Sequence, residues 1–224
     1  MDVRNGMIAK EFIDYKNQDD VIVFASGVSN SNEINESEFK REEDLLISTI
    51  SKNMNKKFIY FSTCSMYDMY FPNNAYTQHK LRMERVISNN SKNYTIFRLS
   101  QVIGKNNKSQ LLGFLHDKIE KGKVFDLYDI ERNIIDISDV KKIVDRVVQK
   151  KIFNNTIINI ANKRNISVLN LVNKLENILN EKAKYKLIKK NGAFKINTEN
   201  IDFLLDELKI DDLYIDTILR KYYA

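Results

Sequence analysis

The sequence predicts an α/β protein, in which a parallel sheet is covered by helices and followed by a smaller α+β part. Three observations predict this class. Short apolar runs rich in Val, Ile, Phe and Tyr alternate with segments of helical periodicity. Three of these runs end in small polar residues, where parallel sheets carry their ligand sites. After residue 162 the alternation stops and a different pattern begins.

Four apolar runs are predicted strands of this sheet, and four further segments show the periodicity of helices. The strands are expected at residues 20–26, 57–63, 94–100 and 156–161, and the helices at 6–17, 36–53, 75–90 and 139–150. The C-terminal part is expected to contain a helix at 167–180, a strand at 183–190 and two short amphipathic helices within 197–223. With six Gly and one Pro, Asn must supply many of the turns.

Composition bounds the function. A chain of 224 residues with 43% hydrophobic content can form one compact domain, or a core domain with a small appendage. Its net charge of +6 is spread among 30 acidic residues without a basic run, so nucleic-acid binding is not predicted. No stretch approaches the ~20 apolar residues of a membrane span. One cysteine and two histidines predict a cytoplasmic protein without a disulfide or a metal site.

The most informative motif is a Tyr-x-x-x-Lys spacing, which occurs twice. A lysine-rich chain with 11 Tyr should contain about one such spacing by chance. Tyr185 and Lys189 lie in a segment of period-2 alternation, so they are separated along a predicted strand. Tyr76 and Lys80 instead open a helical segment, which brings them one turn apart on one face. The second pair is therefore the candidate catalytic pair.

Small polar residues follow three of the predicted strands. The run at 20–26 ends in Ser26 and Gly27, the next ends in Ser62 and Thr63, and the third is followed by Gln101. For any single strand an ordinary turn is the better interpretation. Three such ends in register favour a ligand site at the carboxyl edge of the sheet.

In order along the chain, six segments resemble the extended short-chain dehydrogenase/reductases, in particular the NAD-dependent epimerase/dehydratase family that acts on nucleotide sugars. The segments are 19–30, 56–68, 75–87, 94–107, 131–140 and 157–179. The resemblance implies a Rossmann-like sheet. It assigns residues 1–104 and 133–162 to the cofactor-binding part, and residues 105–132 and 163–224 to a smaller substrate-binding part.

The resemblance also implies roles for individual residues. Tyr76 would be the acid–base group, Lys80 would lower its pKa and bind the nicotinamide ribose, and Thr63 would hydrogen-bond the sugar oxygen. The implied contacts to NAD or NADP are Gly6, Met7, Ile8, Ser26, Gly27, Ser62, Tyr76, Lys80 and Leu99. The implied contacts to a nucleotide-sugar substrate are Ser65, Gln101, Ser109 and Arg132, with Arg132 on the diphosphate.

The N-terminal region departs from the family pattern. Arg4 stands where the first glycine of the phosphate-binding turn belongs, and only Gly6 and Ala9 keep that pattern. Either the arginine turns away or binds phosphate, or the native protein begins upstream. Two strands and a helix of typical relatives have no counterpart before residue 20, and the acid that binds the adenosine ribose is among them. The choice between NAD and NADP is therefore open, and a non-catalytic scaffold with a weakened cofactor site is the alternative to an enzyme.

The expected reaction follows from the residues after Thr63. Dehydratase relatives carry an Asp-Glu pair there, whereas this chain has Cys64 and Ser65, which are poor acids and bases near neutral pH. Epimerisation or keto-reduction of a nucleotide-linked sugar, in surface polysaccharide biosynthesis, is thus the expected activity. The family likeness of segments 36–53 and 75–90 also implies a homodimer.

Three features carry no predicted role in the chemistry. His79 is expected at the surface or in an interface, because it points about 100° around the helix from Lys80. Cys64 is expected to be a packing residue. The charged residues of 39–46 are expected to form a solvated helix face.

Overall fold

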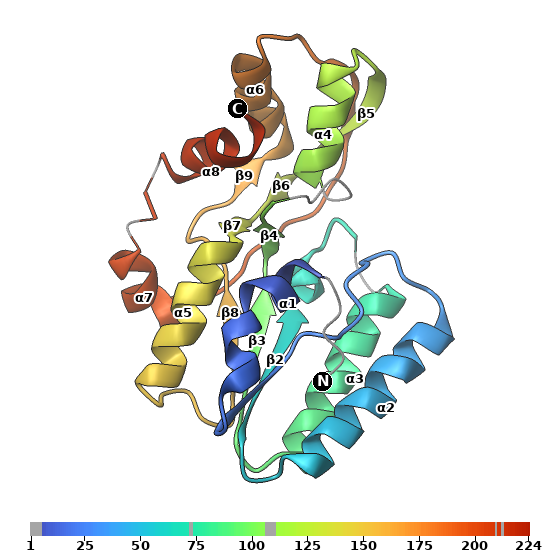
Figure 1. The fold of residues 1–224 in the computed structure, drawn as a ribbon. Helices are drawn as coiled ribbons and strands as arrows, with labels where there is room; N and C mark the ends of the chain where they lie inside the picture. Colours follow the sequence, from blue (N-terminus) through green and yellow to red (C-terminus); the bar gives the residue numbers. More distant parts are fainter. Residues whose placement is uncertain (1–5, 72–73, 106–110, 209, 212) are drawn as a thin grey trace.

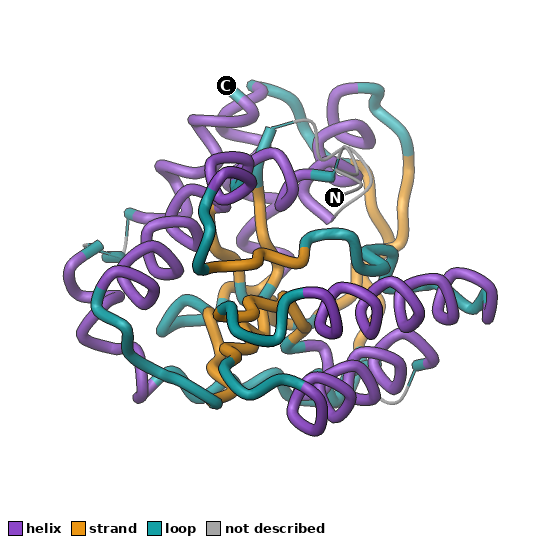
Figure 2. Tube along the Cα trace, turned by 60° about the horizontal axis from the view of Figure 1, so that its bottom comes forward, coloured by secondary structure: helices purple, strands orange, loops and turns teal. Residues whose placement is uncertain are grey.

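The computed structural model describes residues 6–71, 74–105, 111–208, 210–211 and 213–224. The described chain folds into a parallel sheet with helices on both sides, topped by a smaller group of helices and short strands (Figure 1). When the molecule is turned, the largest group of strands lies in the middle with helices around it, and other strands lie nearer the edge (Figure 2). The α/β class is confirmed.

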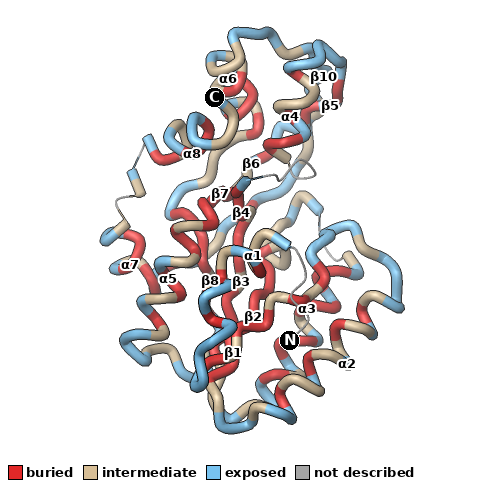
Figure 3. The backbone as a smooth tube through the Cα atoms, in the orientation of Figure 1, coloured by how far each residue is buried: buried red, intermediate tan, exposed pale blue. Residues whose placement is uncertain are grey.

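The main sheet of the described residues has four parallel strands in the order β1, β2, β3, β8. They are β1 (Val21–Phe24), β2 (Lys57–Thr63), β3 (Tyr94–Leu99) and β8 (Thr156–Ile160), which confirms the four predicted strands. Every residue of β2 is buried (Figure 3). Thr63 pairs with Leu99, and Leu99 with Ile160, so three strands end level with one another.

The two faces of the sheet are covered by different helices. On one face lie α2 (Glu36–Lys52) and α3 (Ala75–Asn90), where Phe58 and Tyr60 of β2 join a core cluster with Leu46 and Met83. On the other face lie α1 (Met7–Glu11), the 3-10 turn η1 (Ile13–Asn17) and α5 (Ile137–Gln149). This division follows from the alternation of side chains along a strand, since Ile59 and Phe61 belong to the second cluster.

Polar side chains fix where the long helices begin. The side chains of Asn35, Asn74, Asp136 and Ser167 accept backbone hydrogen bonds at the N-termini of α2, α3, α5 and α6 (Val168–Leu179). Such a cap stabilises a helix by about 1 kcal/mol. The Asn74 cap sets the rotation of the first turn of α3, which carries Tyr76.

The smaller part is built around a parallel pair of strands, β5 (Val124–Asp129) and β10 (Lys184–Lys189). Helices α4 (Leu111–Glu120), α6 and α8 (Tyr214–Tyr223) pack with it through residues such as Leu115, Leu175 and Ile218. Two short pairs join it to the main sheet, β4 (Gln101–Ile103) with β7 (Ile134–Asp136) and β6 (Glu131–Arg132) with β9 (Ile166–Ser167). The 3-10 turn η3 (Glu199–Ile201) leads into α7 (Asp202–Glu207), which lies beside α5 (Figure 1).

Most of the predicted elements are present. Strand 183–190 appears as β10, which places Tyr185 and Lys189 apart along a strand, and the two short C-terminal helices are α7 and α8. The predicted helix 6–17 is divided into two at Phe12. Strands β4, β6, β7 and β9 are two or three residues long, too short for a periodic pattern to predict them.

Candidate active site

Tyr76 and Thr63 meet at the carboxyl edge of the sheet. Tyr76 lies in the first turn of α3, and Thr63 is the last residue of β2. Their side chains lie within hydrogen-bonding reach of each other, although 13 positions separate them. The Thr63 hydroxyl also donates to Ser65 Oγ at 2.8 Å and accepts from the Ser65 backbone N–H at 3.0 Å. The three side chains therefore form one polar group.

The Tyr76 phenol is held in its neutral form. Burial raises the pKa of Tyr76 above its ordinary value, the hydrogen bond with Thr63 opposes this rise, and the negative charge of Glu42 adds to it. The expectation that this tyrosine has a lowered pKa is therefore wrong. Near neutral pH, Tyr76 carries its proton.

Lys80 lies one turn after Tyr76, but its ammonium points to other partners. Nζ donates to Glu42 Oε1 at 3.0 Å and to Tyr60 Oη at 3.1 Å. It lies 5.0 Å from the centre of the Tyr60 ring and 5.8 Å from that of Tyr76. The side chain is buried, and burial lowers the pKa of Lys80 while the Glu42 charge opposes that fall. No hydrogen bond from Lys80 to the Tyr76 oxygen is found within the described residues.

Glu42, on α2, is the centre of this buried cluster. Oε1 accepts from Lys80 and, at 2.6 Å, from Tyr60 Oη. Oε2 accepts from the Val28 backbone N–H at 2.6 Å and lies 2.9 Å from His79 Nε2. Although burial alone would raise the pKa of Glu42, these partners hold it well below its ordinary value. The carboxylate is therefore ionised and fully hydrogen-bonded without water.

Two sequence predictions fail at this cluster. Glu42 is fully buried, although Lys40 and Asp44 of the same run are exposed as predicted, so the solvated helix face is wrong for Glu42. His79 is 3% exposed, so the prediction of a surface histidine is also wrong. A signal for Glu42 was present in the sequence: it continues the stripe of Phe39, Leu46 and Ile50, the other buried residues of α2. His79 is buried because its ring stacks on Phe39 at a centroid distance of 4.6 Å.

Beneath this cluster, Glu84 binds the strand ends together. It forms a bidentate pair with Arg98 of β3, at 2.9 and 2.6 Å, and accepts from Ser62 Oγ at 2.6 Å. Arg98 also donates to Tyr67 Oη at 2.9 Å. Glu84 follows Lys80 by four residues, so one face of α3 carries Tyr76, Lys80 and Glu84 in succession. Sequence reasoning missed Glu84.

Gly27 lies against the ion pair of Glu42 and Lys80. A Cβ at this position would lie 2.7 Å from both Glu42 Oε1 and Lys80 Nζ, so a side chain has no room. The preceding Ser26 is buried, and its backbone oxygen accepts from Arg41 at 3.3 Å. The structure thus brings the end of β1 together with Lys80, and the end of β2 together with Tyr76.

The remaining residues expected at a cofactor lie in two places. Leu99 is buried at the end of β3, level with Thr63. Gly6 caps the start of α1 and is exposed, and no atom of the described residues lies within 4 Å of an added Cβ. Met7 and Ile8 follow it and pack against the main core. Arg4 lies outside the described residues.

Arg132 is placed in an aromatic setting between the two parts of the fold. Its guanidinium pairs with Asp68 at 3.1 Å and lies 5.3 to 5.9 Å from the ring centres of Tyr70, Phe71 and Phe194. Burial lowers the pKa of Arg132, and the Asp68 charge opposes this. A diphosphate would have to share this arginine with Asp68.

The other residues expected at the substrate are partly defined. Gln101 opens β4, where its backbone N–H donates to Asn133 at 3.1 Å. Ser65 is half-buried beside Thr63, and Ser109 lies outside the described residues. Cys64 is fully buried with its thiol 3.2 Å from the Arg98 carbonyl, and burial raises its pKa. It is a packing residue, as predicted.

The sequence model of the NAD dependent epimerase/dehydratase family matches residues 1–161. The chain belongs to this family. The match covers the whole main sheet and the cluster of Thr63, Tyr76 and Lys80. No curated protein matches the chain in sequence.

Solved structures of epimerase/dehydratase enzymes share the fold. UDP-N-acetylglucosamine 4-epimerase from Methanobrevibacter ruminantium M1, in complex with UDP-N-acetylmuramic acid, is similar with a TM-score of 0.73 at 15% identity, over 97% of this chain and 79% of that one. UDP-N-acetylglucosamine 4-epimerase from Bacillus cereus is similar with a TM-score of 0.72 at 16% identity, over 98% of this chain and 96% of that one. The dTDP-glucose 4,6-dehydratase from Bacillus anthracis str. Ames, in complex with NAD, is similar with a TM-score of 0.68 at 18% identity, over 90% of this chain and 72% of that one.

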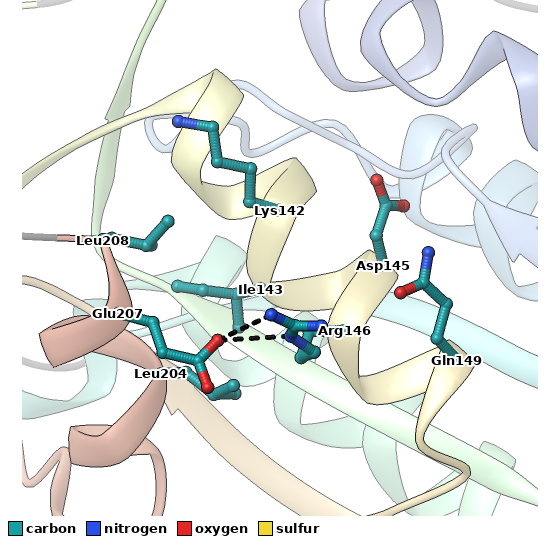
Figure 4. A pocket seen from close by; sticks show the side chains of 8 residues that line it. All are labelled: Lys142, Ile143, Asp145, Arg146, Gln149, Leu204, Glu207 and Leu208. Atoms are coloured by element: carbon teal, nitrogen blue, oxygen red, sulfur yellow. Dashed lines mark hydrogen bonds and ion pairs between the residues drawn. The ribbon is translucent and has the colours of Figure 1, made fainter.

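A separate pocket of about 490 Å³ lies between α5 and α7 of this epimerase/dehydratase fold (Figure 4). Arg146 and Glu207 form an ion pair of 3.0 Å across it. None of its lining residues was expected at the active site: Lys142, Ile143, Asp145, Arg146, Gln149, Leu204, Glu207 and Leu208.

Neither a metal-binding cluster nor a membrane-spanning helix is present in the described residues. They hold no group of three or more His, Cys, Asp or Glu side chains arranged for a metal ion. Across the same residues, no helix combines the length and the apolar character of a membrane span.

Proposed function

We propose that the chain is an NAD(P)-dependent nucleotide-sugar epimerase or 4-keto-reductase of the cytoplasm, acting in surface polysaccharide biosynthesis. The neighbouring hydroxyl groups of Thr63 and Tyr76 at the carboxyl edge of the sheet carry this proposal. A hydroxyl group on a sugar can be oxidised or formed only if its proton is moved, and a phenol beside a second hydroxyl can do this.

In this proposal, Tyr76 Oη exchanges a proton with the sugar oxygen, and the Thr63 hydroxyl donates a hydrogen bond to the same oxygen. The nicotinamide would supply or accept the hydride. Because the pKa of Tyr76 is raised, the site is set to give a proton rather than to take one. This favours reduction of a keto sugar over oxidation of a hydroxyl group.

Two observations support a binding place for a dinucleotide, one of open space and one of an unpaired polar group. Among the described residues, no atom lies within 4 Å of a Cβ added at Gly6, which would allow a phosphate to approach the backbone there. Ser100 Oγ, just after β3, is buried and has no hydrogen-bond partner among the described residues. The proposal assigns the cofactor to residues 1–104 and 133–162, with contacts at Gly6, Met7, Ile8, Ser26, Gly27, Ser62, Tyr76, Lys80 and Leu99.

Dehydration of the sugar is disfavoured at this site. Elimination of water needs a group that protonates the leaving hydroxyl, and the residue after Thr63 is Cys64. Its thiol is fully buried, contacts the Arg98 carbonyl and has a raised pKa. We therefore assign epimerisation or keto-reduction, with Ser65, Gln101, Ser109 and Arg132 at the substrate and residues 105–132 and 163–224 forming its binding part.

One observation favours a second candidate, a non-catalytic scaffold. Glu42 engages the ammonium of Lys80, and the Tyr76 phenol is neutral. A short-chain dehydrogenase that has lost its cofactor could retain such a cluster as a core feature. Cofactor binding discriminates the two candidates.

The first experiment is calorimetric titration with NAD⁺, NADH, NADP⁺ and NADPH. The enzyme proposal predicts binding of at least one form, and no binding at millimolar concentration would leave only the scaffold candidate.

The second experiment is incubation with UDP-, GDP-, CDP- and dTDP-sugars, including 4-keto forms, with the products followed by NMR. Formation of a 4-keto-6-deoxy sugar from a plain hexose would contradict the assigned reaction.

Light scattering tests the accompanying proposal of a homodimer through α2 and α3.

A further inference from the structure

Glu42 is a buried carboxylate that the proposed chemistry does not use. Each of its oxygens has two partners, and its side chain is fully shielded from solvent. A buried charge is tolerated only when it is paired and hydrogen-bonded, and Lys80 supplies the opposite charge. Gly27 leaves the space that the pair occupies, because a Cβ at this position would clash with both side chains.

We propose that Glu42 is a positioning residue for the acid–base centre: it holds the Lys80 ammonium against Tyr60 and cancels its charge beside the Tyr76 ring. This inference rests on the proposed function, because it takes Tyr76 as the group that moves the proton.

The hydrogen bonds define the state of each member of the cluster. Arg82 can only donate, and its NH2 lies 3.2 Å from His79 Nδ1, so Nδ1 is an acceptor. His79 is then the neutral tautomer with its proton on Nε2, which donates to Glu42. Tyr60 donates to Glu42 and accepts from Lys80. The cluster thus contains one negative and one positive charge, which cancel.

The charges around Tyr76 come from three elements. Helix α2 contributes Glu42, which acts on Tyr76, and Arg41, which acts on Lys80. Helix α3 contributes Lys80, 5.8 Å from the Tyr76 ring centre, and Glu84, which acts on Lys80. The third element, β2, contributes Tyr60, which is uncharged and hydrogen-bonded to both Glu42 and Lys80. Glu42 lies nearest to Lys80, and its charge opposes ionisation of Tyr76. Neutralising Glu42 leaves the Lys80 charge uncancelled beside the Tyr76 ring, which favours the phenolate.

The test is a double-mutant cycle with a fluorinated tyrosine at position 76. The fluorine lowers the intrinsic pKa of the phenol, so that its ¹⁹F signal titrates in an accessible pH range. Relative to the native sequence, Glu42→Gln should lower the pKa of this residue by about one unit, a tenfold change in proton dissociation. Lys80→Met should raise it by a similar amount. The double variant should lie close to the native value, because it loses both charges.

Glu36→Gln is the matched control, since Glu36 lies on the same helix but is exposed. It should leave the titration unchanged. A folded Glu42→Gln protein whose Tyr76 titrates as in the native sequence would overturn the inference. If Glu42→Gln alone does not fold, the double variant decides: a pKa within a few tenths of the native value supports charge cancellation, and a shift of a full unit contradicts it.

The readout is independent of turnover. Absence of cofactor binding and of any product would reject the proposed function, while the titration would still report on Glu42. Conversely, an active enzyme with an unshifted titration would reject only the role of Glu42. In an active enzyme, the loss of keto-reduction at high pH should begin at lower pH in Glu42→Gln, because Tyr76 ionises earlier.

Discussion

Lys80 Nζ lies 3.0 Å from Glu42 Oε1, and at most 3% of either side chain is exposed to solvent. The two residues are 38 positions apart, on different helices. A charge in such a place is strongly destabilising when its partner is removed, because water cannot replace it. The pair therefore couples the packing of α2 and α3 to the geometry of the active site.

The first prediction concerns stability. Lys80→Ala leaves the Glu42 carboxylate buried without its counter-charge, and the free energy of unfolding should fall by about 3–5 kcal/mol. Urea unfolding measures this. Lys40→Ala is the control, because Lys40 pairs with Asp44 on the exposed side of α2 and should change stability little. Equal effects of the two substitutions would contradict the account.

The second prediction concerns acid. The folded-state pKa of Glu42 lies below its unfolded value, so its contribution to stability is complete above about pH 4.3 and is lost as the pH falls below that value. The native protein should lose stability between pH 5 and pH 3. Glu42→Gln should lose less over the same interval, measured by urea unfolding at each pH. If the free energy of unfolding falls equally steeply with pH in both proteins, protonation of Glu42 is not linked to unfolding.

The third prediction concerns Gly27. Gly27→Ala forces a methyl group to within 2.7 Å of Glu42 and Lys80, whose positions are fixed by hydrogen bonds. Overpacking of this kind costs about 1–3 kcal/mol. Gly6→Ala should cost less, because its added Cβ meets no atom within 4 Å. The midpoint of thermal unfolding compares the two, and a Gly27→Ala protein as stable as the native one would contradict the packing described.

The fourth prediction concerns Arg132. If it binds the diphosphate, Arg132→Ala should weaken UDP binding by about 10- to 150-fold, since a charge-assisted hydrogen bond contributes about 1.5–3 kcal/mol. Titration calorimetry measures the affinity. Arg85→Ala, on the exposed face of α3, is the control and should bind as the native protein does. Unchanged affinity in Arg132→Ala would leave Arg132 as the structural partner of Asp68 alone.

The sequence predicted what depends on local patterns. The four strands, the long helices and the contrast between Tyr76 on α3 and Tyr185 on β10 follow from periodicity. It did not predict the partners of Lys80, because these depend on how α2 packs against α3. Glu42 was taken for a solvent-exposed residue, since its neighbours in sequence are charged, yet its position in the apolar stripe of α2 decided its burial.

The lowered pKa expected for Tyr76 failed for a related reason. A lysine one turn away on a helix is a neighbour in sequence, but its long side chain can reach several partners. Here the ammonium donates to Glu42 and Tyr60, while burial, together with the Glu42 charge, raises the pKa of the Tyr76 phenol. The short strands that join the two parts, such as β6 with Arg132, lay below the length at which periodicity is informative.

The most direct test of the central claim is turnover by Tyr76→Phe compared with Tyr185→Phe. The substitution removes only the phenol oxygen that hydrogen-bonds Thr63, so the fold and the affinity for the nicotinamide cofactor should be nearly unchanged. NMR of the sugar products should show conversion by the native protein and by Tyr185→Phe, and none by Tyr76→Phe. Conversion by Tyr76→Phe at the native rate would show that the hydroxyl pair at the end of β2 is not the acid–base centre.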